Sequence, residues 1–103
     1  KGALTEQFVL QQLMSEMGIH PNYWSNDTSN SEVDFIIEHQ QNLFPIEVKA
    51  DENLQSKSLK SYHQQFDPKM SIRTSLSHIR KEDWLINIPL YAIREIRSII
   101  SEL

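Results

Sequence analysis

Two neighbouring segments of alternating apolar and polar residues constrain the fold of this chain most. Residues 31–39, SEVDFIIEH, and residues 43–50, LFPIEVKA, each have the period of two that is typical of half-buried strands. The stretch HQQN between them can turn the chain, so the pattern predicts a β-hairpin. If the turn is centred between Gln40 and Gln41, opposed residues have numbers that sum to 81.

This register brings two acids together. It predicts two apolar pairs on the core face, Val33 with Val48 and Phe35 with Ile46, and it places Asp34 directly opposite Glu47. Opposed Cβ atoms lie roughly 4.5–5.5 Å apart, and two like charges at that distance are destabilising unless something lies between them. A divalent cation fits, because Mg²⁺ prefers one or two carboxylates plus waters and phosphate oxygens, and a nearby main-chain carbonyl can add to the set.

Lys49 is expected on the same strand face as Glu47, two residues further on. There its ammonium group could hold an attacking water and offset developing negative charge. A structural alternative stays open: the two acids could be exposed on an open sheet face, with Lys49 neutralising them at little gain in stability. Pro45 cannot donate to the ladder and could mark an edge or bulge that shifts the register.

The remaining segments predict helices on both sides of a sheet. Residues 3–17 have helical spacing at Leu10, Leu13, Met14 and Met17, with Gly18 as a stop. The other expected elements are a short strand NYWSN, a helix over SKSLKSYHQQF ended by Asp67-Pro68, a strand in KMSIRTSL, a strand near 84–88, and a helix from Pro89 that buries Ile93, Ile96 and Ile100. This order predicts a small three-layer α/β domain on a mixed sheet.

Glu6 is the one acid on the apolar stripe of the first helix, at offsets of four, seven and eleven from Leu10, Leu13 and Met17. It is therefore a candidate to face the same site as Asp34 and Glu47. The ordinary alternative is an acid in a first helical turn after a capping Thr5, where it complements the helix dipole.

Composition excludes several kinds of site. The 103 residues include no cysteine and two glycines, so thiolate metal sites, cysteine nucleophiles and a glycine-rich phosphate loop are ruled out. The four histidines lack ligand spacing, and the two tryptophans are expected at the core or its rim. Apolar runs are too short to cross a bilayer, so we expect one soluble, cytoplasmic domain over 1–103. Because the chain opens on Lys1 directly before a helix, we expect a fragment of a longer protein.

Charge is unevenly distributed along the chain. The net charge is −4, yet residues 1–48 carry one lysine against seven acids, whereas residues 49–81 carry seven bases against three acids. The basic excess follows directly after IEVK and includes Lys57 and Lys60 on the predicted second helix. These lysines are candidates for nucleic-acid phosphate contacts, and an ordinary solvated helix face is the alternative.

Taken together, Glu6 in a first helix, Asp34 in a strand and Ile46-Glu47-Val48-Lys49 in the next strand resemble the PD-(D/E)XK nuclease superfamily. More narrowly, KGALTEQFVLQQL, YWSN, SEVDFIIE, FPIEVKA and SKSLKSY look like the C-terminal domain of unknown function attached to a family of prokaryotic AAA-type ATPases. The resemblance extends from Lys1 to about Tyr91. It departs from the superfamily at Val33, where the proline of the P-D pair is expected.

The resemblance implies a restriction-endonuclease-like fold, a mixed central sheet flanked by helices. It implies Asp34, Glu47 and the main chain of Val48 as ligands of Mg²⁺ or Mn²⁺, Lys49 as the catalytic lysine and Glu6 as an accessory acid. The expected function is metal-dependent hydrolysis of nucleic-acid phosphodiester bonds. The alternative is a catalytically idle recognition or regulatory module of an AAA-type ATPase in the same polypeptide.

Overall fold

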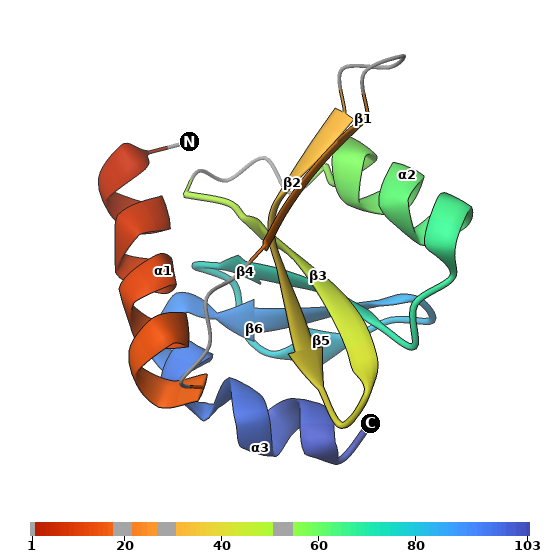
Figure 1. Cartoon of the computed structure of the whole chain (residues 1–103). Coiled ribbons are helices and arrows are strands. Elements are labelled where there is room, and N and C mark those ends of the chain that lie inside the picture. Colours follow the sequence, from red (N-terminus) through yellow and green to blue (C-terminus); the bar gives the residue numbers. More distant parts are fainter. Residues whose placement is uncertain (1, 18–21, 27–30, 51–54) are drawn as a thin grey trace.

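The computed structural model describes residues 2–17, 22–26, 31–50 and 55–103. The elements follow in the order α1 (Ala3–Met17), β1 (Asn22–Asn26), β2 (Ser31–His39), β3 (Asn42–Val48), α2 (Lys57–Phe66), β4 (Ser71–Ser75), β5 (Arg80–Lys81), β6 (Leu85–Pro89), the 3₁₀ helix η1 (Leu90–Glu95) and α3 (Ile96–Ser101). The strands form one six-stranded sheet in the order β1-β2-β3-β4-β6-β5 (Figure 1).

Helices cover both faces of this sheet, as the sequence predicts. On one face, apolar side chains of α1, η1 and α3 pack against those of β2, β3, β4 and β6 in the larger core cluster. On the other face, α2 buries Leu59 and Tyr62 against Val33, Ile36 and Leu85. Figure 1 shows α1 and α3 on one side of the strands and α2 on the other. The result is a three-layer α/β arrangement on a mixed sheet.

Helix α1 has the predicted bounds but a shifted apolar stripe. Val9 and Leu13 are completely buried and Leu10 is half-buried, whereas Met14, expected in the core, is 39% exposed. The stripe therefore follows Glu6, Val9 and Leu13, which lie three or four residues apart on one helix face. Glu6 is half-buried on this stripe.

The β2–β3 hairpin has the predicted register from Phe35 to His39. The predicted pairs Asp34 with Glu47 and Val33 with Val48 do not form, because the pairing ends at Phe35 and Ile46 and the bulge in β2 lies beyond it. Phe35 pairs with Ile46, and the pairing continues to His39 with Asn42, so that all these partners have numbers that sum to 81. Gln40 and Gln41 form the two-residue turn, and their φ values of 53° and 67° are the positive values that a type I′ turn requires. Pro45 lies within the strand without shifting this register.

One part of the predicted pattern is wrong, because β2 contains a bulge. Val33 was expected on the core face with Phe35, but it packs with Ile36 in the cluster under α2, while Phe35 is in the cluster on the α1 side. The pairing of β2 with β1 shows the cause: Asn22 is opposite Ile36 and Trp24 is opposite Val33, so two residues of β2 face one of β1. A bulge of this kind switches the side chains beyond it to the other face.

The second half of the sheet is parallel. β4 pairs in parallel with β3 on one side and with β6 on the other, and every residue of β4 and β6 is buried. The predicted helix from Pro89 begins as the 3₁₀ helix η1 and becomes α3, and it buries Ile93, Ile96 and Ile100 as expected. The two-residue strand β5, which the sequence does not predict, pairs with β6 at the sheet edge.

Within the described ranges, no helix combines the length and apolar character needed to span a bilayer.

Candidate metal site and its surroundings

Asp34 lies at the bulge, where β2 and β3 stop pairing. The last paired residues at this end of the hairpin are Phe35 and Ile46. The main-chain N–H of Lys49 donates to Thr74 O in β4 at 2.9 Å, so the preceding N–H, that of Val48, points the other way, toward β2. There it donates to Asp34 Oδ2 at 2.8 Å. The Asp34 carboxylate is therefore held against the Glu47–Val48 main chain.

Glu47 is on the face of β3 that α2 covers. The side chain is only 7% exposed, and its strand position is in parallel register with Arg73 of β4. Glu47 lines a hollow of about 180 Å³ together with Lys49, Lys57 and Ser58. The structure thus brings Glu47 and Lys49 to one hollow, at the first turn of α2.

Glu6 lies elsewhere. It lines a separate hollow of about 190 Å³ between α1 and the sheet, with Gln7, Leu10 and Phe35. The two hollows have no lining residue in common. Phe35 follows Asp34 directly in β2, so Glu6 approaches the sheet next to the bulge, from the α1 side, while Glu47 faces α2.

Asp34 and Glu47 are candidate ligands for a small divalent cation that takes few protein ligands. In the parts of the chain that the structure describes, no three His, Asp or Glu side chains are grouped to hold a metal. A magnesium-type site does not need three, because Mg²⁺ usually keeps several waters and takes one or two carboxylates plus substrate phosphate oxygens. Asp34, which accepts from the Val48 N–H, and Glu47, the residue before Val48, are the two candidate carboxylates for a site of this kind.

A buried polar network adjoins Glu47, and sequence reasoning missed it. Arg73 is 4% exposed, and its Nε donates to Asn87 Oδ1 at 2.9 Å. Ser75 Oγ donates to the same oxygen at 2.7 Å, and Asn87 Nδ2 donates to the carbonyls of Ser77 and His78. The strand pattern of KMSIRTSL marks Arg73 as a polar-face residue, but nothing local shows that a helix will cover that face.

Burial affects the charge of Arg73. Desolvation lowers the pKa of its guanidinium, the carboxylate of Glu82 opposes this shift, Arg80 adds to it, and Glu47 opposes it. The buried guanidinium of Arg73 therefore favours a negative charge on the α2 side of the sheet.

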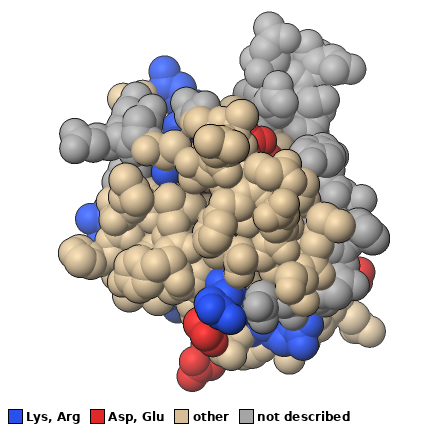
Figure 2. All heavy atoms as spheres, turned by 90° about the vertical axis from the view of Figure 1, so that its left-hand side faces the viewer, with Lys and Arg blue, Asp and Glu red and all other residues tan. Residues whose placement is uncertain are grey.

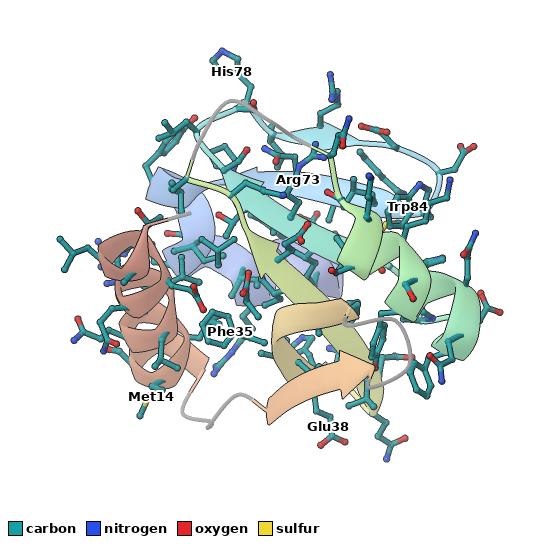
Figure 3. The ribbon with its side chains drawn as sticks, turned by 90° about the horizontal axis from the view of Figure 1, so that it is seen from above. Met14, Phe35, Glu38, Arg73, His78 and Trp84 are labelled. Atoms are coloured by element: carbon teal, nitrogen blue, oxygen red, sulfur yellow. The ribbon has the colours of Figure 1, made fainter. Side chains whose placement is uncertain are left out.

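Lys57 and Lys60, the predicted phosphate contacts, occupy the first turns of α2 and are exposed. Lys57 lines the Glu47 hollow and an adjoining hollow, which it shares with Lys60, Arg73 and Trp84. Figure 3 shows Arg73 and Trp84 on the α2 side of the sheet and Phe35 on the α1 side. The basic residues that follow IEVK in sequence are thus gathered around the start of α2.

The structure is thus a mixed α/β domain in which candidate acidic residues lie where the β2–β3 pairing ends and basic residues lie around the start of α2. Residues 1–93 match the model of the family described as Domain of unknown function (DUF4143), and the chain belongs to this family. No curated protein matches the chain, and no solved structure matches it either.

Proposed function

We propose that this domain is a metal-dependent nuclease of the PD-(D/E)XK type that hydrolyses phosphodiester bonds of nucleic acid. The observation that carries the proposal is the bond from the Val48 N–H to Asp34 Oδ2. It holds one carboxylate against the strand segment that presents Glu47 and Lys49. The bulge that turns Asp34 toward β3 and the burial of a second acid, Glu47, in that strand support this proposal.

In this proposal, each residue has a separate role in the reaction. Asp34, Glu47 and the Val48 carbonyl would hold Mg²⁺ or Mn²⁺, which supplies Lewis-acid polarisation of a phosphoryl oxygen and a more acidic bound water. Lys49 positions the attacking water and offsets the negative charge that develops on the phosphate. The oxygen of water bonds to phosphorus as the water loses a proton. The bond from phosphorus to one ribose or deoxyribose oxygen breaks, and that oxygen takes up a proton and leaves as a hydroxyl group. Lys57 and Lys60 bind phosphates of the strand, and Glu6 is an accessory acid near the bulge.

The second candidate is a catalytically idle recognition or regulatory module of an AAA-type ATPase in the same polypeptide. The outer face of α1 favours it, because Leu4 and Phe8 are 87% and 45% exposed and every exposed residue of that helix is uncharged where side chains are described. Figure 2 shows this side of the molecule with few charged side chains across its middle. Apolar residues that recur at helical spacing on a surface are typical of a face that a partner covers.

The deciding experiment is metal-dependent cleavage of labelled single- and double-stranded DNA and RNA. It compares the wild type with Asp34→Asn, Glu47→Gln and Lys49→Met, in the 103-residue chain and in the full-length gene product. Asp34→Asn keeps an oxygen that can accept from Val48 N–H and removes only the charge. We expect cleavage with Mn²⁺ or Mg²⁺ alone, reduced by roughly 100-fold or more in each variant. Lys69→Met, an exposed lysine outside the site, is the matched control and should cleave normally.

Thermal unfolding separates metal binding from catalysis. Mn²⁺ should raise the melting temperature of the wild type and of Lys49→Met by mass action, and it should not raise that of Asp34→Asn. Cleavage that survives in Asp34→Asn would contradict the proposed site. Metal-induced stabilisation without cleavage, in both the short and the full-length protein, would favour the recognition module.

A further inference from the structure

A second hollow, which we call the α2 pocket, lies beside the Glu47 hollow and is about 290 Å³ in volume. Its main lining residues are Ser56, Lys57, Lys60, Arg73, Glu82 and Trp84. Lys57 lines both hollows, so the two are neighbours along the first turn of α2. The volume is at the lower end of ligand pockets, which run from about 300 to 1,000 Å³, and this suits a ligand of modest size.

The charges around the α2 pocket favour an anion. Lys57, Lys60 and Arg73 are three cations against one carboxylate, Glu82, and that carboxylate contacts Arg80 at 3.2 Å. Asn87 holds Arg73 Nε, and Arg73 Nη1 donates to Ser56 Oγ at 3.4 Å at the start of α2. The guanidinium is thus fixed from two sides before any ligand arrives. Since desolvation lowers the pKa of Arg73, an anion in the pocket would offset the cost of burying its charge.

An aromatic wall completes the α2 pocket. Trp84 is half-buried, and its ring meets the His63 ring at a centroid distance of 5.3 Å and an angle of 62°. His63 Nδ1 in turn is 2.8 Å from the buried Ser71 Oγ, which fixes the imidazole. The indole is therefore held in place beside three cations, and Figure 3 shows it next to α2. Many proteins that bind single-stranded nucleic acid use cations that contact the phosphates together with an aromatic ring on which a base stacks.

We infer that the α2 pocket binds one nucleotide of a single strand, with its phosphate against Arg73, Lys57 and Lys60 and its base against Trp84. This inference deepens the proposed function and rests on it for the nucleic-acid substrate. It narrows the substrate class, because base faces are hidden in a duplex and can reach an aromatic side chain only when the base is unpaired. A strand seated there would continue over Lys57 toward Glu47 and Lys49.

The test is binding of a fluorescein-labelled oligo(dT) 12-mer to the 103-residue chain in EDTA, where no metal-dependent cleavage can occur. Competitors are the same sequence as a duplex with oligo(dA), AMP and inorganic phosphate. The variants are Trp84→Leu, Trp84→Phe and the pair Lys57→Gln with Lys60→Gln. Lys69→Gln is the matched control, because Lys69 is an exposed lysine near the opposite end of α2.

We expect the single strand to bind more tightly than the duplex, and Trp84→Leu to weaken it about tenfold. Trp84→Phe should keep most of the affinity, because it keeps an aromatic face. The double lysine variant should reduce the slope of log K against log salt by about 1.4, and Lys69→Gln should leave it unchanged. AMP should compete better than inorganic phosphate if the base contributes.

Unchanged single-strand affinity in Trp84→Leu would overturn the inference, as would equal affinity for the duplex. Circular dichroism of each variant shows whether a loss of single-strand affinity reflects unfolding. If Trp84→Leu does not fold, the double variant Lys57→Gln with Lys60→Gln, at two exposed positions, still tests the inference. If the oligonucleotide does not bind while the wild type still cleaves with Mn²⁺, only the inference about the α2 pocket is wrong. If binding holds and no metal supports cleavage, the nuclease proposal is wrong and the pocket stands.

Discussion

At the scale of single residues, Asn87 is the buried side chain that joins Arg73 and Ser75 of β4 to the loop before β5. It is 1% exposed, it accepts hydrogen bonds from Arg73 and Ser75, and it donates to two loop carbonyls. Buried polar groups are inexpensive when they are paired and costly when a partner is removed. Asn87 therefore both positions the Arg73 guanidinium and fixes the loop before β5.

Replacing Asn87 by alanine should destabilise the fold strongly. Asn87→Ala leaves the donors of Arg73 and Ser75 and two loop carbonyls without this partner, so we expect a loss of about 3 kcal/mol in the free energy of unfolding. Urea denaturation followed by far-ultraviolet circular dichroism measures it. Asn42→Ala, which removes one 3.2 Å bond in the hairpin turn, is the control and should cost at most about 1 kcal/mol. Equal losses in the two variants would contradict the role assigned to Asn87.

At the scale of elements, the hairpin turn is the clearest local strain. Gln40 and Gln41 both have positive φ, which costs residues with a Cβ about 1–2 kcal/mol each relative to the usual regions. Both side chains are exposed, so they can be exchanged without changing the core. The turn keeps its geometry because the register of β2 with β3 leaves only two residues to reverse the chain.

Relieving that strain should stabilise the protein. Gln40→Asn with Gln41→Gly supplies the pair that type I′ turns favour, and we expect a gain of about 1 kcal/mol in the free energy of unfolding. Gln64→Gly, at an exposed position inside α2, is the matched control and should lose about 1 kcal/mol. Thermal and urea unfolding give both values. A loss in the turn variant would show that the turn has another conformation.

The same hairpin shows what the sequence could and could not predict. Its register follows from a period of two and a short turn, which are local properties, and so do the bounds of α1. The bulge in β2 was missed because it is set by pairing with β1, and it moved Val33 to the α2 side. Acids in alternating positions pointed to a candidate site, but they could not show that Asp34 would accept a hydrogen bond from the Val48 N–H.

At the scale of the whole molecule, the sequence does not show which faces of the sheet the helices cover. β4 lies between β3 and β6 with helices on both sides, so Arg73 is buried although its neighbours in sequence look like an ordinary half-exposed strand. The same packing creates the α2 pocket from segments that are separate in the sequence. A sequence pattern describes a single strand or helix. The α2 pocket is formed by residues from several elements, so no single pattern could predict it.

The assembly of the α2 pocket has a consequence for the rates of folding and unfolding. Lys57, Arg73 and Trp84 come together only after the chain has crossed from β3 through α2 and paired β4 with β3 and β6 in parallel. Contacts that close such crossovers form late. If the α2 pocket binds an oligonucleotide as we infer, a ligand concentration of 100 times the Kd should slow unfolding by about 100-fold and leave the refolding rate unchanged. Stopped-flow urea jumps with and without ligand measure both rates, and an accelerated refolding arm would mean that the pocket is already formed in the transition state.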